Sequence, residues 1–128
     1  LDTAVLLPID PDASARALRR ALLASGAHEP LALIISDTFG RPWRTGLIDV
    51  ALGSAGIEPI CDLRGELDFA GRALQSTAIA TADQLAAAAG LAMRKGAGTP
   101  AVWIEGVAIR GDGSIRDTLR DPASDLFR

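Results

Sequence analysis

The chain has 128 residues, of which 48% are hydrophobic, and this content is sufficient for one globular domain with its own core. A formal net charge of -3 provides no general basic surface, which argues against nucleic acid or an anionic membrane as the main partner. Cys61 is the only cysteine, which excludes an internal disulfide, and no apolar run reaches the roughly 20 residues of a membrane span. We expect residues 1–128 to form a single domain, or a fragment of one, in a cytoplasmic protein.

The first expected elements are a strand and a helix. The apolar run at residues 4–7 is typical of a strand, which would need another segment or subunit to pair with. Residues 11–25 are predicted to form a surface helix, because Asp10 is a suitable N-cap and Pro11 fits the first helical position. Gly26 then marks the end of the helix.

Two further strands are expected in the next part of the chain. The five apolar residues at 31–35 show no polar alternation, which is typical of a central α/β strand that is covered on both faces. At residues 48–52, apolar and other side chains alternate with a period of two, which is typical of a half-buried strand. An amphipathic helix is the alternative for residues 48–52.

The second half of the chain is expected to contain one long helix and one short strand. Residues 77–95 are rich in alanine and end in Arg94 and Lys95, with Gly96 beyond, as in a closely packed helix. Residues 101–104 are predicted to form a strand. These elements predict an α/β fold, with α+β as the alternative, in which a mixed sheet has flanking helices and belongs to a larger intertwined domain.

The candidates for chemistry directly follow the five-residue apolar run. In open α/β sheets, ligands bind at the carboxyl ends of strands, where the carboxylate of Asp37 would suit Mg²⁺ or Mn²⁺ and Thr38 could add a hydroxyl. Gly40 allows close backbone approach to a phosphate. Arg41 and Arg44 carry planar groups that match phosphates or carboxylates. Together these residues predict a site for a metal and a nucleotide.

Each candidate also has a structural explanation. Asp37 and Thr38 suit a turn in which side chains bind the backbone, with both arginines solvated. Asp83 is either a second metal ligand or, more commonly, an acid that favours the start of a helix. The charged residues 62–72 are either a hairpin with compensating charges or a lid over an anionic ligand. His28 has no sequence partner for metal or nucleophilic chemistry and is expected at the surface.

Several stretches of the sequence resemble a known family. The stretch SDTFGRPWRTGLIDVALGSAG, followed by DLRGELDFAGR, TAIATADQLAAAAGLAMRKG and DPASDLFR, is similar to the coenzyme F-420-0:L-glutamate ligase family, also called F-420 γ-glutamyl ligase. The resemblance covers nearly the whole chain, including LLPIDPDASARALRRAL. It implies a ligase, dependent on GTP and a divalent metal, that joins L-glutamate by an amide bond to the lactyl-phosphate side chain of a deazaflavin coenzyme.

The resemblance also implies roles for single residues. The aspartate that matches Asp37 is a metal ligand in this family, the position of Gly40 lies beside the nucleotide, and members form intertwined homodimers. Members carry a further N-terminal segment with nucleotide contacts, and this chain is similar to the part that follows it. Many members have an acid after the threonine that matches Thr77, where this chain has Ala78. Thr77 and Asp83 are then the candidate ligands of a second metal ion.

The implied reaction needs no nucleophilic serine, cysteine or histidine. GTP would convert a carboxylate into an acyl phosphate, which the amine of glutamate then attacks. Phosphoryl transfer requires positioning and charge neutralisation, for which Arg41 and Arg44 are the candidate catalytic residues. A non-catalytic nucleotide-binding or assembly fragment of such a protein is the alternative.

Overall fold

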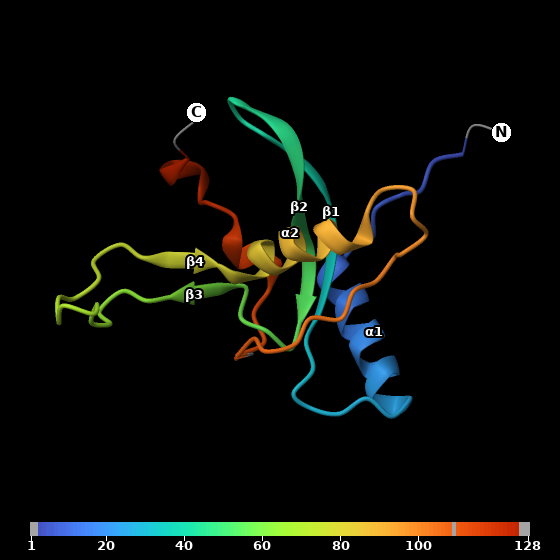
Figure 1. The fold of residues 1–128 in the computed structure, drawn as a ribbon, viewed down its shortest axis with the longest axis horizontal. Coiled ribbons are helices and arrows are strands. Elements are labelled where there is room, and N and C mark those ends of the chain that lie inside the picture. Colours follow the sequence, from blue (N-terminus) through green and yellow to red (C-terminus); the bar gives the residue numbers. More distant parts are fainter. Residues whose placement is uncertain (1–2, 109, 126–128) are drawn as a thin grey trace.

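The computed structural model describes residues 3–108 and 110–125 of the chain (Figure 1). The described elements follow in the order α1 (Pro11–Ala24), β1 (Leu33–Arg41), β2 (Arg44–Ala55), β3 (Ile60–Asp62), β4 (Ala78–Ala80), α2 (Thr81–Met93) and the short 3-10 helices η1 (Ile115–Thr118) and η2 (Pro122–Ser124). The predicted combination of strands with flanking helices is confirmed. Both strand pairs of the described chain are antiparallel, as in the α+β alternative. None of the described helices is long and apolar enough to cross a membrane.

The centre of the fold is a long antiparallel hairpin formed by β1 and β2 (Figure 1). Its pairing runs from Leu33 and Ala55 at the open end to Arg41 and Arg44 at the turn. Trp43 takes a φ of 55° in this turn, a region that bulky residues seldom occupy. The hairpin therefore carries the sequence around Asp37 along a paired strand instead of into a loop.

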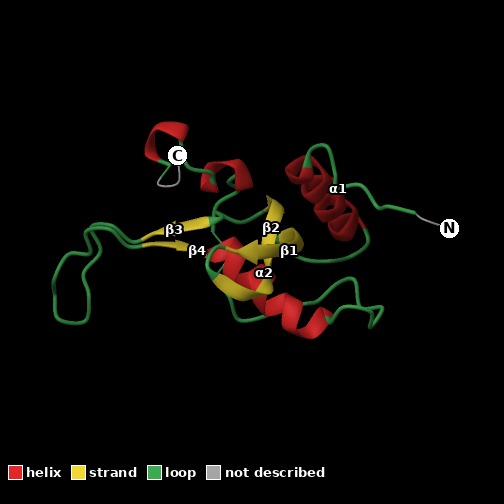
Figure 2. Ribbon diagram, turned by 90° about the horizontal axis from the view of Figure 1, so that it is seen from above, coloured by secondary structure: helices red, strands yellow, loops and turns green. Residues whose placement is uncertain are grey.

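The helices α1 and α2 pack on opposite sides of this hairpin (Figure 2). A buried cluster joins Ala51 of β2 to Ala82 and Ala86 of α2 and to Ile115, with Ile34 of β1 packed against it. Because most of these side chains are methyl groups, α2 can lie close to the sheet. The alanine-rich sequence therefore marks a helix whose backbone approaches the site.

A buried carboxylate links α1 to distant parts of the chain. Asp12 is 6% exposed and accepts hydrogen bonds from the Ser54 N–H at 2.8 Å, the Ser114 hydroxyl at 2.5 Å and the Ile115 N–H at 3.4 Å. Burial raises the pKa of Asp12, but the hydrogen bonds, with a smaller contribution from the charge of Arg16, outweigh it and hold the pKa below its ordinary value. The ionised side chain therefore ties the start of α1 to the end of β2 and to η1.

A second hairpin, formed by β3 and β4, extends away from the rest of the chain (Figure 1). Its loop contains an isolated bridge between Leu67 and Ala73 and ion pairs within the loop sequence. These ion pairs join Asp62 to Arg64 and Asp68 to Arg72. The prediction of a hairpin with compensating charges for this region is confirmed.

The elements with strong local signals are where the sequence predicts them. The helix expected at residues 11–25 is observed at Pro11–Ala24, and the Asp10 carboxylate caps it by accepting the Ala13 N–H at 2.8 Å. The half-buried strand at residues 48–52 lies within β2. His28 is exposed, as expected.

The predicted central strand at residues 31–35 is wrong in two respects. β1 begins at Leu33 and continues to Arg41, so Asp37 lies within the strand and not at its end. β1 pairs only with β2 among the described strands, and its apolar residues 33–35 are half-buried, while Phe39 is exposed. The ladder continues past the apolar run because it is made by backbone groups, which β2 supplies along its whole length.

Three further predictions differ from the structure. Residues 4–7 form no strand with any described residue and are exposed, and residues 101–104 likewise make no strand pairing within the described part. The helix predicted for residues 77–95 begins only at Thr81, because residues 78–80 pair with β3. In all three cases the outcome depends on a distant pairing partner that the local sequence does not specify.

Candidate active site

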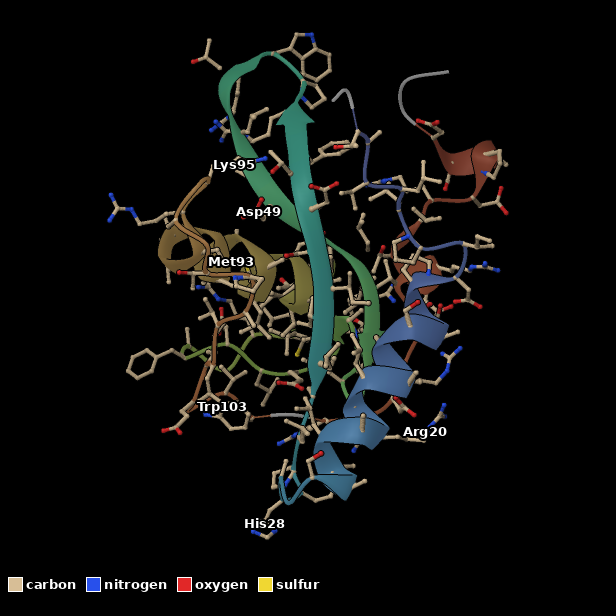
Figure 3. All side chains as sticks on the ribbon, turned by 90° about the vertical axis from the view of Figure 1, so that its right-hand side faces the viewer. Arg20, His28, Asp49, Met93, Lys95 and Trp103 are labelled. Atoms are coloured by element: carbon tan, nitrogen blue, oxygen red, sulfur yellow. The ribbon has the colours of Figure 1, made fainter. Side chains whose placement is uncertain are left out.

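A cleft of about 450 Å³, called the polar cleft here because charged side chains line it, lies between the β1–β2 hairpin and the C-terminal end of α2. Its polar lining comes from two walls, which carry Asp37, Thr38 and Asp49 on the strands and Arg94, Lys95 and Thr99 after the helix. Figure 3 shows Asp49, Met93 and Lys95 around this cleft. The walls carry opposite charges, which is an arrangement suited to a ligand that contains both a cation and an anion.

The register of the hairpin places Thr38 directly opposite Asp49. The Thr38 hydroxyl donates a hydrogen bond of 3.2 Å to Oδ1 of Asp49. Asp49 and Ala51 are two residues apart in β2, so both face α2, and Thr38 lies beside Asp49 on the same face. A register shift beside Ser36 separates this part of the hairpin from its open end.

Asp49 also fits closely against α2. A Cβ atom added at Gly90 would lie 1.9 Å from Oδ2 of Asp49, so only glycine leaves room for the carboxylate. Within the described part of the chain, Thr38 is the one hydrogen-bond donor to Asp49. Helix and strand thus hold a half-buried carboxylate in place, with an oxygen that no described donor occupies.

We predict that Gly90→Ala destabilises the complete protein, although the same change normally stabilises a helix by about 0.5–1 kcal/mol. The new methyl group must displace the Asp49 carboxylate or separate α2 from β2, at a cost of about 1–3 kcal/mol. Urea denaturation measures the free energy of unfolding. The matched variant is Gly90→Ala combined with Asp49→Ala, in which the methyl group has room. If Gly90→Ala lowers stability as much in the Asp49→Ala background as alone, the contact with Asp49 is not the cause.

Asp37 borders the same cleft and is exposed. It lies opposite Val50 in the ladder, and its Oδ1 accepts the N–H of Thr38 at 2.6 Å. The side-chain-to-backbone contact that was the structural alternative is therefore present, although in a strand and not in a turn. This contact occupies Oδ1 and leaves Oδ2 without a donor among the described residues.

The other nucleotide candidates lie at the tip of the hairpin, outside the lining of the polar cleft. A Cβ at Gly40 would meet no atom within 4 Å, so the backbone there is open to approach. Nη2 of Arg41 donates to the Thr45 carbonyl at 2.6 Å, and its buried Nε has no acceptor among the described residues. Arg44 is exposed.

Thr77 and Asp83 lie elsewhere. The Thr77 carbonyl accepts the Leu63 N–H at 3.0 Å at the base of the second hairpin. Asp83, in the first turn of α2, accepts the Ala51 N–H at 2.9 Å, next to the register shift in β2. The structure therefore brings Asp37 and Thr38 together but not with Thr77 or Asp83, whose roles as metal ligands stay predictions.

The donors of the cleft fit part of the coordination shell of a hard cation. Asp37, Thr38 and Asp49 offer carboxylate and hydroxyl oxygens, which Mg²⁺ and Mn²⁺ prefer. The described residues contain no group of three or more His, Cys, Asp or Glu side chains suited to hold a metal ion. Further ligands would therefore have to come from substrate phosphates, water or other parts of the complete protein.

Asp49, Arg94 and Lys95 are site residues that the sequence reasoning missed. In the sequence, Asp49 is one of the polar residues of an alternating strand, and Arg94 and Lys95 fit the basic last turn of a helix. The alternation of Asp49 with its apolar neighbours in the sequence does not indicate that Thr38 lies opposite it in the hairpin. Gly90, a glycine inside an otherwise strong helix sequence, was the one available signal of a close approach.

A second cavity of about 160 Å³, lined mainly by residues with apolar side chains, adjoins the polar cleft and shares Ser36 and Met93 with it. Its lining includes Ile34, Leu85 and Trp103. The charged groups of the region belong to the cleft and not to this cavity, so the chemistry is assigned to the cleft.

Comparisons with known proteins agree with the resemblance. The family model described as F420-0:Gamma-glutamyl ligase matches residues 1–106. The chain is 48% identical over 126 residues to the coenzyme F420:L-glutamate ligase of Methanothermobacter thermautotrophicus, covering 95% of the chain and 50% of that relative. The ligases of the same name from Methanopyrus kandleri and Archaeoglobus fulgidus are 42% and 38% identical, with 97% of the chain and 51% and 50% of each relative covered. The chain thus spans about half the length of the curated relatives it matches.

Proposed function

Since the chain belongs to the F420-0:Gamma-glutamyl ligase family, we propose that the complete protein joins L-glutamate to coenzyme F420-0 in a reaction driven by GTP. The observation that carries the proposal is the family match over residues 1–106, which includes the whole polar cleft. The reaction would belong to the biosynthesis of coenzyme F420, and the substrates would be F420-0, L-glutamate and GTP.

The proposed chemistry has two steps. In the first, a carboxylate oxygen of F420-0 attacks the γ-phosphorus of GTP, a new P–O bond forms, the bond to GDP breaks, and an acyl phosphate results. In the second, the amine nitrogen of glutamate attacks the acyl carbon and inorganic phosphate leaves as the C–N bond forms. The ammonium group of free glutamate gives up one proton to become the attacking amine and a second proton in becoming the amide N–H. The protein contributes positioning and charge stabilisation, which dominate phosphoryl transfer.

The described residues have distinct proposed roles in this reaction. Asp37, Asp49 and the Thr38 hydroxyl would hold Mg²⁺ or Mn²⁺. When bound, such an ion neutralises charge on the phosphate oxygens. The open backbone at Gly40 admits a phosphate, and the arginines at the hairpin tip stabilise the negative charge of the triphosphate.

An isotope experiment tests the proposed acyl phosphate. F420-0 labelled with ¹⁸O in its carboxylate is incubated with the complete protein, GTP, Mn²⁺ and glutamate. One labelled oxygen should appear in the inorganic phosphate for every amide formed. Amide formation without transfer of the label would exclude the acyl phosphate. Binding of GTP without any amide would favour the alternative of a non-catalytic nucleotide-binding or assembly module.

Replacing Arg41 by lysine is expected to raise the apparent KM for GTP more than Arg44→Lys does. Both changes preserve charge, but an ammonium group cannot reproduce the two-pronged contact of a guanidinium. Arg41 lies next to Gly40 and is already held across the turn by its bond to Thr45, so less freedom is lost when it binds phosphate. Steady-state kinetics gives the two KM values. Unchanged kinetics in both variants, or a loss of stability alone in Arg41→Lys, would show that the two arginines stabilise the turn and do not bind GTP.

We also propose that the complete protein is a homodimer, as the resemblance implies. Large apolar side chains on separate segments are almost fully exposed, among them Val5, Ile9 and Phe69. Such side chains favour burial against another surface. Static light scattering at micromolar concentration should give twice the mass of the polypeptide, and a monodisperse monomer would contradict the proposal.

A further inference from the structure

We propose that residues 94–99 form a phosphate-binding loop that holds the terminal phosphate of the nucleoside triphosphate. The proposal rests on the proposed function, in which carboxylates of the polar cleft hold the metal ion that accompanies the triphosphate. The loop follows α2 directly and forms the wall of the cleft opposite Asp37 and Asp49. Sequence reasoning assigned no function to it.

Charge is the first observation that supports the loop. Arg94 and Lys95 line the cleft, and neither makes an ion pair within the described part of the chain. Lys95, the only lysine of the sequence, extends on the same side of the hairpin as Asp49 (Figure 3). Carboxylates on one wall and cations on the other would flank a phosphate that also carries a metal ion.

Unused backbone donors are the second observation. The N–H groups of Lys95, Gly96, Gly98 and Thr99 make no hydrogen bond to any described residue. All four residues line the cleft. Backbone N–H groups in succession are effective donors to phosphate oxygens, because they bring partial positive charge without a bulky side chain.

The backbone conformation of the loop is the third observation. Arg94 has a φ of 48°, and Gly96 and Gly98 have φ values of 80° and 70°. Repeated left-handed residues curve the chain and form concave anion-binding surfaces. A non-glycine residue in this region is strained and persists where function or packing requires it. Arg94 adopts this conformation at the edge of the cleft, where it ends α2.

Two substrates of the proposed reaction contain phosphate, namely the triphosphate of GTP and the phosphodiester of the coenzyme. The triphosphate is favoured because its terminal group carries more negative charge than a diester. It would also share a metal ion with Asp37 and Asp49 across the cleft. The two sources are distinguished by measuring both affinities.

The test uses Lys95→Met in the complete protein. Isothermal titration calorimetry with GTP and Mn²⁺ should show a Kd at least about tenfold higher than in the wild type, since a charge-assisted hydrogen bond to phosphate is lost. The Kd of inorganic tripolyphosphate should rise similarly, and Lys95→Arg should restore most of both affinities. Arg20→Gln removes one positive charge from the exposed face of α1, beyond the hairpin, and should leave both values unchanged (Figure 3).

A second measurement uses the unmodified protein. Tripolyphosphate should slow hydrogen exchange at the amides of Gly96 and Gly98, which have no acceptor in the described chain. Unchanged exchange there, or unchanged affinities in Lys95→Met, would overturn the proposal. A defect of Lys95→Met confined to binding of F420-0 would also overturn it. If the wild type forms no amide but still binds tripolyphosphate through Lys95, the loop is supported and the proposed ligase function fails.

Discussion

Asp37→Asn is expected to remove most of the thermal stabilisation that GTP and Mn²⁺ together give to the complete protein. At a ligand concentration of 100 times Kd, a ligand bound only by the folded state contributes about 2.7 kcal/mol. Loss of an anionic ligand weakens binding of a hard cation strongly, and if Kd rises by a factor of about 100 the same ligand concentration leaves less than about 0.5 kcal/mol. The difference should appear as a loss of several degrees in the ligand-induced shift of Tm.

The asparagine variant isolates the charge of Asp37 from its structural contact. An amide oxygen can still accept the Thr38 N–H that the carboxylate accepts at 2.6 Å, so the strand should keep its local geometry. Glu66→Gln is the matched control, because it removes one negative charge in the loop of the second hairpin, outside the cleft. Equal ligand-induced shifts of Tm for Asp37→Asn and the wild type would show that Asp37 has only a structural role, through its hydrogen bond with the backbone.

Asp12→Ala is expected to lower the free energy of unfolding at neutral pH by about 3 kcal/mol. The change leaves the N–H groups of Ser54 and Ile115 and the hydroxyl of Ser114 without their acceptor in a buried place. Buried polar groups that lose their partner cost more than an exposed hydrogen bond contributes. Urea denaturation measures the difference. Asp12→Asn should be less harmful, since its amide oxygen can still accept from the backbone.

The effect of Asp12 should also depend on pH. Hydrogen bonding in the folded state lowers the pKa of Asp12 below the unfolded value of 3.8, so the carboxylate contributes its full stability above that value. This contribution is lost as the pH falls through the lower, folded pKa. The stability difference between the wild type and Asp12→Asn should therefore shrink between pH 5 and pH 2. A difference that stays constant over this range would show that the charge of Asp12 does not matter.

The sequence predicted the elements that are determined locally. The cap at Asp10 and Pro11 specifies the start of α1 whatever surrounds it, and period-two alternation is enough to identify β2. The boundaries that depend on distant partners could not be predicted in this way. Residues 78–80 have helix-compatible side chains but pair with β3, and β1 continues through Asp37 because β2 lies beside it.

The candidate site was predictable only in part, for a similar reason. Asp37 and Thr38 stand in a conspicuous motif, whereas Asp49 becomes a neighbour of Thr38 through the irregular pairing near the hairpin turn. Arg41 pairs with Arg44, but Gly40 pairs with Leu47, so the register of the tip cannot be counted from the turn. The position of Asp49 beside Thr38 therefore could not be predicted from the sequence.

For Asp83, the sequence indicated the position in a helix but not the group that the carboxylate contacts. Its position in the first turn of α2 fits both a helix-stabilising acid and a metal ligand. The observed bond to the Ala51 N–H connects it to the irregular part of β2 and does not place it in the cleft. The sequence therefore did not distinguish a structural role of Asp83 from a role as a metal ligand.

The complete protein is proposed to form the amide between glutamate and F420-0 at the expense of GTP. Mass spectrometry of the coenzyme after incubation with GTP, Mn²⁺ and L-glutamate tests this directly. We expect a product heavier than F420-0 by one or more glutamyl residues, formed only when GTP is present and accompanied by one GDP for each glutamate added. An unchanged coenzyme mass under conditions in which the Methanothermobacter thermautotrophicus relative forms the product would contradict it.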